Sequence, residues 1–317
     1  MNFISYADLS EDIRKNMHKL HGREIDLVVG IPRSGMIPAY MIALYLNVNC
    51  LDLASLCRNE KPVNGRTRKT SNNLVHAWDA KKILLVDDSI MSGISMRSAV
   101  KQLPDELVEK LIKMAVYSAS TTPREVDIYF EHVACPRVFE WNIYHHDVLA
   151  GSCSDIDGTL CVNPTKGQSE DDGKYMHFLT NAKPLNLPSR KIHSLISSRL
   201  EKYRKETETW LKEHNIKYEH LIMLDLPSNR HRESHKIYAN HKAEHYNKSK
   251  LDFFFESEPD QALAIAKATS KPVYCSGNNR VYQSSALESI YTAPSFWVLR
   301  NICKKLKQSL PDPARRH

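Results

Sequence analysis

The sequence predicts an α/β protein built from two doubly wound, parallel-sheet domains. Short apolar runs alternate with helical runs along all 317 residues, which is typical of parallel sheets covered by helices. This length is enough for about two domains, each with its own core. A segment of small residues at Ala150–Ser152 precedes a new strand and marks the expected boundary. We therefore expect domains over residues 1–150 and 151–299, followed by a basic tail over residues 300–317.

Buried strands are expected where apolar runs are short, and helices where apolar residues recur at helical spacing. In the first half, strands are predicted over Ile25–Ile31, Val48–Leu53, Lys82–Asp88 and Leu111–Ser118, with helices over Met36–Leu46 and Ser95–Leu103. In the second half, strands are predicted over Leu149–Asp155, Ile192–Ser197, Leu221–Asp225, Leu251–Glu256 and Pro272–Cys275. The clearest helical pattern covers Ser198–His214, with Asn215 as its stop.

The composition excludes several classes of protein. No run approaches the roughly 20 apolar residues of a membrane-spanning helix, and the first residues hold no apolar signal core. The 7 cysteines show no CxxC spacing, which favours reduced thiols in a cytoplasmic protein over disulfides or a zinc site. Of the 15 histidines, 6 lie between His214 and His245 in a polar segment, and we interpret them as surface residues rather than metal ligands.

The net charge of +7 is unevenly distributed. Residues 1–150 are neutral, whereas residues 300–317 hold 6 basic side chains and 1 acidic one. A solvated basic tail is the favoured interpretation. Contact of this tail with RNA, DNA or another anionic partner remains the alternative.

An acidic pair followed by a hydroxyl-rich turn gives the first candidate site. Residues 83–96 read ILLVDDSIMSGISM, so a buried strand leads into two carboxylates and then a turn into a helix. Backbone N–H groups and hydroxyls at such a turn suit a phosphate, and the carboxylates suit ribose hydroxyls or Mg²⁺. The residues concerned are Asp87, Asp88, Ser89, Ser92, Gly93 and Ser95.

This segment resembles the 5-phosphoribosyl-1-pyrophosphate (PRPP) motif of type I phosphoribosyltransferases, although Met91 and Ile94 replace the Thr and Gly of many members. A second segment, VVGIPRSGMIPA at residues 28–39, resembles the pyrophosphate loop of the same family. The resemblance implies that Arg33, Ser34 and Gly35 face the pyrophosphate of PRPP, and that the basic loop Asn59–Asn73, with Arg66, closes over it. An ordinary charged loop is the equal alternative for that last segment.

The hexapeptide DIDGTL, which begins at Asp155, gives the second candidate site. It resembles the first motif of haloacid dehalogenase-like (HAD) phosphatases. The resemblance implies a Mg²⁺-dependent enzyme in which Asp155 is the nucleophile and Asp157 the general acid and base. It also implies that Ser197 binds the phosphoryl group, with Lys242 as the stabilising lysine and Lys236 as its rival. It further implies two acidic metal ligands after the strand at residues 251–256, which ends at Glu256 with Glu258 and Asp260 beyond it, and the exact pair stays open. The expected metal ligands are Asp155, Asp157, Glu256, Glu258 and, in the first site, Asp88.

The two resemblances together favour a cytoplasmic, bifunctional enzyme of nucleotide metabolism. It would transfer a phosphoribosyl group from PRPP with Mg²⁺ and hydrolyse a phosphomonoester, acting on nucleotides or sugar phosphates. The alternative is a regulatory or defence protein that senses PRPP or a nucleotide through one or both sites. Tyr117, Phe139 and Trp141 could stack on an acceptor base, with core packing as the alternative role. A homodimer is left open, and no membrane partner is expected.

Overall fold

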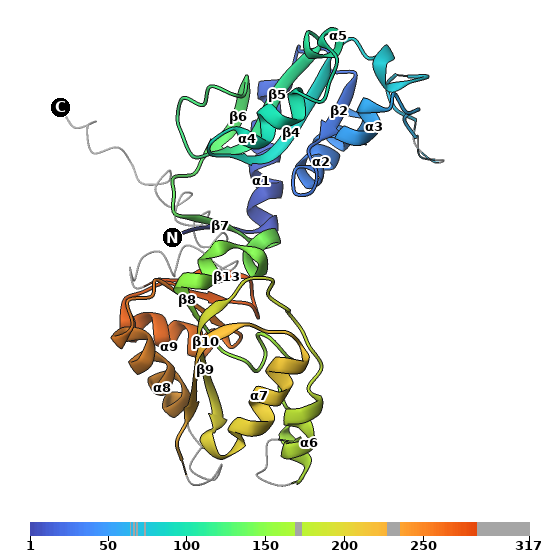
Figure 1. Ribbon diagram of the computed structural model, residues 1–317. Coiled ribbons are helices and arrows are strands. Elements are labelled where there is room, and N and C mark those ends of the chain that lie inside the picture. The colour runs from blue at the N-terminus through green and yellow to red at the C-terminus, as the bar shows by residue number, and fades with distance from the viewer. Residues whose placement is uncertain are drawn as a thin grey trace, which may run out of the picture. The chain divides into compact units, whose positions relative to one another are not determined.

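The computed structural model describes residues 1–63, 65, 67, 69–72, 74–168, 173–226 and 235–283, without the side chains of residues 235 and 236. It divides into two compact units, of which the first spans Met1–Trp141 and the second begins at Asn142 (Figure 1). Arg66, the side chain of Lys236 and the basic tail over residues 300–317 lie outside the described residues.

The first unit is built on a five-stranded parallel sheet with the strand order β3-β2-β4-β5-β6. Its strands are β2 (Leu27–Gly30), β3 (Asn49–Asp52), β4 (Ile83–Ile90), β5 (Leu111–Ser118) and β6 (Ile128–His132). Its helices are α1 (Tyr6–Asn16), α2 (Met36–Leu46), α3 (Leu53–Cys57), α4 (Ile94–Val100) and α5 (Asp105–Val108).

Both faces of this sheet are covered, which explains why its strands are apolar throughout. Val28 and Leu84 point to the face that holds Leu9 of α1 and Ile42 of α2. Their neighbours Val29 and Leu85 point to the opposite face, against α3, α4 and α5. This alternation follows from the two-residue period of a strand. The expected α/β fold with parallel sheets is therefore confirmed.

A separate two-stranded ladder joins the beginning of the first unit to its end. β1 (Asn2–Ile4) pairs in parallel with β7 (Arg137–Phe139). Ser5 follows β1 and caps α1, since its side chain accepts from the backbone N–H of Asp8 while the Asp8 carboxylate accepts from the N–H of Ser5. This ladder places residues 137–141 beside the N-terminal helix of the unit.

The second unit contains a six-stranded sheet with the order β10-β9-β8-β11-β12-β13, in which only the β12–β13 pair is antiparallel. The strands are β8 (Ser152–Ser154), β9 (Ile192–Leu200), β10 (Tyr218–Leu224), β11 (Phe253–Glu256), β12 (Val273–Cys275) and β13 (Arg280–Tyr282). The helices are α6 (Gly173–Asn181), α7 (Arg204–Glu213), α8 (His235–Lys248) and α9 (Pro259–Thr269). α8 and α9 bury Ala243, Tyr246 and Ile265 against Phe254 of the sheet.

Short 3-10 helices connect several of these elements, at Met17–Leu20, Ala77–Asp79, Glu140–His145, Asp147–Gly151, Lys166–Gln168 and Glu201–Tyr203. Several expected boundaries shift by a few residues, and two of these shifts bear on the candidate sites. β4 continues through the acidic pair to Ile90, because Ser89 and Ile90 still pair with β5. The helix expected from Ser198 begins only at Arg204, because β9 extends to Leu200, which pairs with Leu224 of β10.

Candidate functional sites

The acidic pair of the first unit lies inside the last part of β4, where both side chains are nearly removed from water. Asp87 is 7% exposed and Asp88 is 5% exposed. Burial, and then the neighbouring charge of Asp88, raise the pKa of Asp87 to about 7, although a hydrogen bond from Ser95 partly offsets this. Two crowded carboxylates at this position favour the uptake of either a proton or a cation.

Asp88 connects three segments of the first unit. The Ser34 hydroxyl donates to Oδ1 of Asp88 at 2.9 Å, and the indole Nε1 of Trp141 donates to its Oδ2 at 2.7 Å. Each carboxylate oxygen of Asp88 therefore accepts a hydrogen bond from another side chain of the protein. The expected pyrophosphate loop and the acidic pair, which are separated by more than 50 residues in sequence, are in direct contact.

Gly35 makes the approach of this loop possible. A Cβ atom at this position would lie 2.6 Å from the carbonyl oxygen of Ile31 and 2.8 Å from that of Val86. Both neighbours are backbone atoms, which cannot rotate away. Only glycine therefore lets residues 31–35 lie directly against the middle of β4, at Val86. Arg33, from the same loop, is exposed.

The hydroxyl-rich turn is fixed by a left-handed glycine and an ion pair. Gly93 has φ = +72°, and a Cβ there would lie 2.3 Å from Cγ of Glu125. Arg97 donates to the carbonyl oxygen of Ser92 at 3.2 Å and to Glu125 at 2.7 Å. Ser92 on this turn and Ser95 in the first turn of α4 are exposed, whereas Ser89 is half-buried within β4.

The aromatic candidates divide into two groups. Tyr117 and Phe139 are buried, and their rings lie 5.5 Å apart in the core, so their role is packing. Trp141 is only half-buried, stacks on Phe139 at 4.9 Å and reaches Asp88. Its contact with the acidic pair was not foreseen from sequence, because the indole comes from a segment 53 residues away from Asp88.

The site of the second unit centres on a buried lysine. Nζ of Lys242 donates to Asp155 Oδ2 at 2.6 Å, to Glu256 Oε2 at 2.7 Å and to Gln261 Oε1 at 3.1 Å. Burial would lower the pKa of Lys242, but the charges of Asp155 and Glu256 raise it above its ordinary value. Burial raises the pKa of Asp155 to about 7, and the charge of Lys242 partly offsets this effect.

Asp157 belongs to a second charge pair. Nη2 of Arg199 donates to Asp157 Oδ1 at 2.7 Å, and Nε lies 3.2 Å from both carboxylate oxygens. The Arg199 side chain is completely buried, and Nη1 and Nη2 also reach Thr207 and Cys161 at 3.4 and 3.3 Å. Burial opposes the charge of Arg199, but Asp157 raises its pKa above the ordinary value. The two aspartates of the DxD motif thus have different cationic partners.

The remaining expected residues of this site are distributed as follows. Ser197 is completely buried, and its hydroxyl accepts from the backbone N–H of Arg199 at 3.2 Å. Glu258 is exposed, and its Oε1 accepts a hydrogen bond from Nδ2 of Asn163 at 3.2 Å. Of the four acids expected as metal ligands in this unit, Asp155 and Glu256 are the two that accept hydrogen bonds from Nζ of Lys242. Gly158 has φ = +73°, and a Cβ there would lie 2.2 Å from the Ser257 hydroxyl, so this position requires glycine.

Arg199 was missed in the sequence although a signal was present. It follows Ser197 by two residues, and alternate residues of a strand point to the same face. Because β9 extends to Leu200, Arg199 lies on the strand and not on the expected helix. A charged residue at an inward position of a buried strand indicates a buried partner, which here is Asp157.

Comparison with known proteins supports the assignment of the first unit. Residues 4–148 match the model of the phosphoribosyl transferase domain family. The xanthine-guanine phosphoribosyltransferase of Chromohalobacter salexigens is 30% identical over 142 residues, which cover 44% of this chain and 83% of that protein. The chain therefore belongs to the phosphoribosyltransferase family, and its first half is the phosphoribosyltransferase domain.

Two solved phosphoribosyltransferase structures are also similar to this chain. The xanthine-guanine-hypoxanthine phosphoribosyltransferase of Helicobacter pylori is 15% identical and covers 45% of this chain and 93% of its own, with a TM-score of 0.34. The purine phosphoribosyltransferase of Pyrococcus horikoshii is 19% identical and covers 44% and 92%, with a TM-score of 0.33. Among the described residues, no helix is long and apolar enough to cross a membrane.

Proposed function

We propose that the first half transfers the 5-phosphoribosyl group of PRPP to a purine base. The contact between Ser34 and Asp88 is the observation that carries this proposal, because it joins the loop expected to face pyrophosphate to the acids expected to face ribose. The relative from C. salexigens is a xanthine-guanine phosphoribosyltransferase, which makes a 6-oxopurine the first acceptor to test.

The chain's own residues would bind and orient PRPP in this site. Asp87 and Asp88 would accept the ribose hydroxyls, and the turn of Ser92 and Gly93 would offer N–H and O–H donors to the 5-phosphate. The exposed guanidinium of Arg33 would pair with the pyrophosphate as it leaves.

The donor set also fits Mg²⁺, because two adjacent carboxylates are buried together and one has its pKa raised to about 7. Asp87 and Asp88 would hold the ion, which would supply charge neutralisation at the pyrophosphate.

The test is to incubate the protein with PRPP, MgCl₂ and guanine, xanthine or hypoxanthine, and to measure pyrophosphate and nucleoside monophosphate. We expect both products in equal amounts from the wild type, and a loss of at least about 100-fold in Asp87→Asn. Asp105→Asn, an exposed acid of the same unit, is the matched control. If PRPP binds in calorimetry without turnover, the domain is a PRPP sensor, which is the alternative function.

We further propose that the second half hydrolyses phosphomonoesters through an aspartyl-phosphate. The pairing of Asp155 and Asp157 with two different cationic side chains, Lys242 and Arg199, favours this function. Asp155 is paired with Lys242, which would balance the charge of a phosphoryl group attached to Asp155, and Glu256 shares the same ammonium group. Asp157, held by Arg199, would give a proton to the leaving group and then take one from water. Ser197 would bind the phosphoryl oxygens.

A divalent cation also fits this donor set, because two buried carboxylates share a single ammonium group and leave an excess negative charge. Asp155 and Glu256 would hold Mg²⁺, which would neutralise the phosphoryl oxygens. The test is hydrolysis of 4-nitrophenyl phosphate and of nucleoside monophosphates, followed as released phosphate. Asp155→Asn should abolish turnover, whereas Asp252→Asn, an exposed acid of the same unit with no assigned role, should not. Equal rates of phosphate release in Asp155→Asn and the wild type would refute this proposal.

A further inference from the structure

The outer edge of the second sheet carries a cluster of side chains that neither proposed activity uses. β10 is the edge strand and pairs in parallel with β9. The register places Tyr218 opposite Ile192 and His220 opposite Ser194, so Glu219 lies opposite His193. Three side chains with metal-ligand chemistry therefore come from two adjacent strands.

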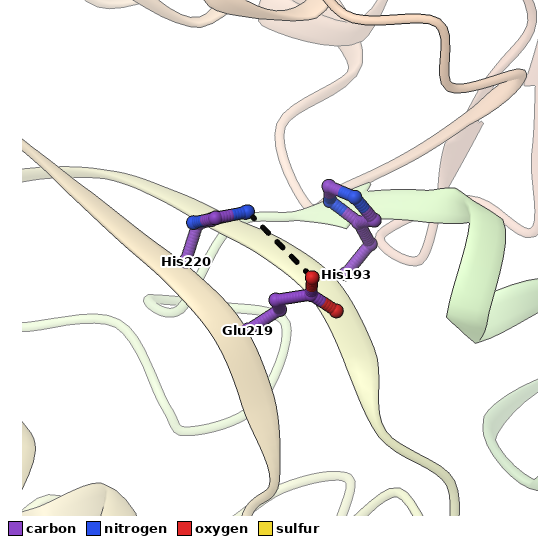
Figure 2. Close-up of side chains that lie close together, drawn as sticks. All are labelled: His193, Glu219 and His220. Atoms are coloured by element: carbon purple, nitrogen blue, oxygen red, sulfur yellow. Dashed lines mark ion pairs between the residues drawn. The ribbon is translucent and has the colours of Figure 1, made fainter.

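The ligand atoms of these side chains are close together. One atom from each of His193, Glu219 and His220 lies within 4.8 Å of the other two, and Figure 2 shows Glu219 between the two rings. Nε2 of His220 is 3.9 Å from Oε1 of Glu219, and the ring centroids of His193 and His220 are 5.2 Å apart. Ligands of tetrahedral zinc lie about 3.4 Å from one another. Glu219 and His220 are exposed, so their side chains have room to rotate toward that spacing.

Two of the three ligands already have a partner on their far side. Nδ1 of His193 lies 2.8 Å from the hydroxyl of the buried Ser194, and the tautomer that donates to this hydroxyl leaves the lone pair on Nε2. Lys191 Nζ lies 2.9 Å from Oε2 of Glu219, which leaves Oε1 toward His220. Metal sites are built in this way, with outer groups that orient the ligands.

We propose that His193, Glu219 and His220 form a binding site for a first-row transition metal ion, with Zn²⁺ as the probe. Two imidazoles and one carboxylate favour such ions over Mg²⁺ and Ca²⁺, which prefer oxygen ligands. Three protein ligands leave a coordination position for water. The ammonium group of Lys191 offsets the charge of Glu219, so we expect weaker binding than at a closed structural zinc site. The competing explanation is that these polar groups only prevent an edge strand from pairing with another chain.

The test is calorimetric titration of the full chain, freed of metal by a chelator, with ZnCl₂ in excess MgCl₂. We expect one equivalent of Zn²⁺ to bind, and His193→Asn and His220→Asn each to weaken binding at least about tenfold. His21→Asn, an exposed histidine of the first unit, is the control and keeps wild-type affinity. Lys191→Met removes a positive charge beside the ion and tightens binding by about tenfold.

The last variant separates the two explanations, because an edge-protection role predicts no Zn²⁺ response to Lys191→Met. Absence of stoichiometric Zn²⁺ binding in the wild type would overturn the proposal, as would equal affinity in wild type and His220→Asn. Since Glu219 and His220 are both exposed, Glu219→Gln and His220→Asn keep the test valid if His193→Asn fails to fold.

Discussion

The buried pair of Arg199 and Asp157 allows the most detailed prediction. Arg199→Met removes the guanidinium but keeps a long apolar side chain, so Asp157 loses its contacts at 2.7 and 3.2 Å. Breaking a buried pair by removing one partner costs about 3–5 kcal/mol. Asp157 is 18% exposed and can recover some water, which places the expected loss at the lower end, about 3 kcal/mol. The expected fall in Tm of the second unit is about 6–12 °C.

The same variant tests how the proposed phosphatase moves protons. If Arg199 holds Asp157 in position as general acid, its loss should matter most when the leaving group is a poor one. We expect kcat/KM to fall about 100-fold for an alkyl phosphate such as a nucleoside monophosphate, and only a few-fold for 4-nitrophenyl phosphate. Arg199→Lys, which keeps the charge, should recover part of the loss on the alkyl phosphate.

Arg204→Met is the matched control, because Arg204 is part-exposed and its pairs with Glu201 and Glu208 are worth at most about 1 kcal/mol. An equal loss on both substrates in Arg199→Met would refute the role of Arg199 in positioning the proton donor. A change in unfolding free energy of less than about 0.5 kcal/mol would refute the strength assigned to the buried pair.

Three further predictions concern the first unit. Because the folded pKa of Asp87 is raised to about 7, the folded state retains a proton that the unfolded chain loses near pH 4. Stability should therefore decline as pH rises from about 4 to 7, by no more than about 4 kcal/mol, and urea titrations of Asp87→Asn should lack this part of the decline. Gly35→Ala should cost about 1–3 kcal/mol and abolish PRPP binding, since its Cβ would meet two carbonyl oxygens, whereas Gly167→Ala, with open space around it, should change neither. Trp141→Phe keeps the stack on Phe139 but removes the donor to Asp88, so we expect PRPP affinity in calorimetry to change about tenfold and thermal stability to change little; an unchanged affinity would exclude a role for this hydrogen bond in the site.

The central strands of both sheets and the glycine-containing turns could be predicted because their physical requirements are local, whereas β1, β6, β7 and β13 were not predicted. A strand with both faces covered must be apolar throughout. The helix α2 also begins and ends at the expected residues, Met36 and Leu46. The end of β9 could not be placed, because its last residues are held by pairing with Leu224 of β10, a neighbour that becomes adjacent only in the folded sheet. α1, α8 and α9 were missed as helices for a similar reason, since their buried faces are defined by the sheet against which they pack.

The sequence by itself determined the parallel α/β architecture, the family of the first half and the positions of the acidic motifs. These features depend on residue types within a few positions of one another. The tertiary structure alone decided how the charges are shared: Lys242 between Asp155 and Glu256, Arg199 with Asp157, and Ser34 and Trp141 on Asp88. Each of these contacts joins distant segments, and burial gives each its strength, because a buried charge requires a partner that no local pattern can identify.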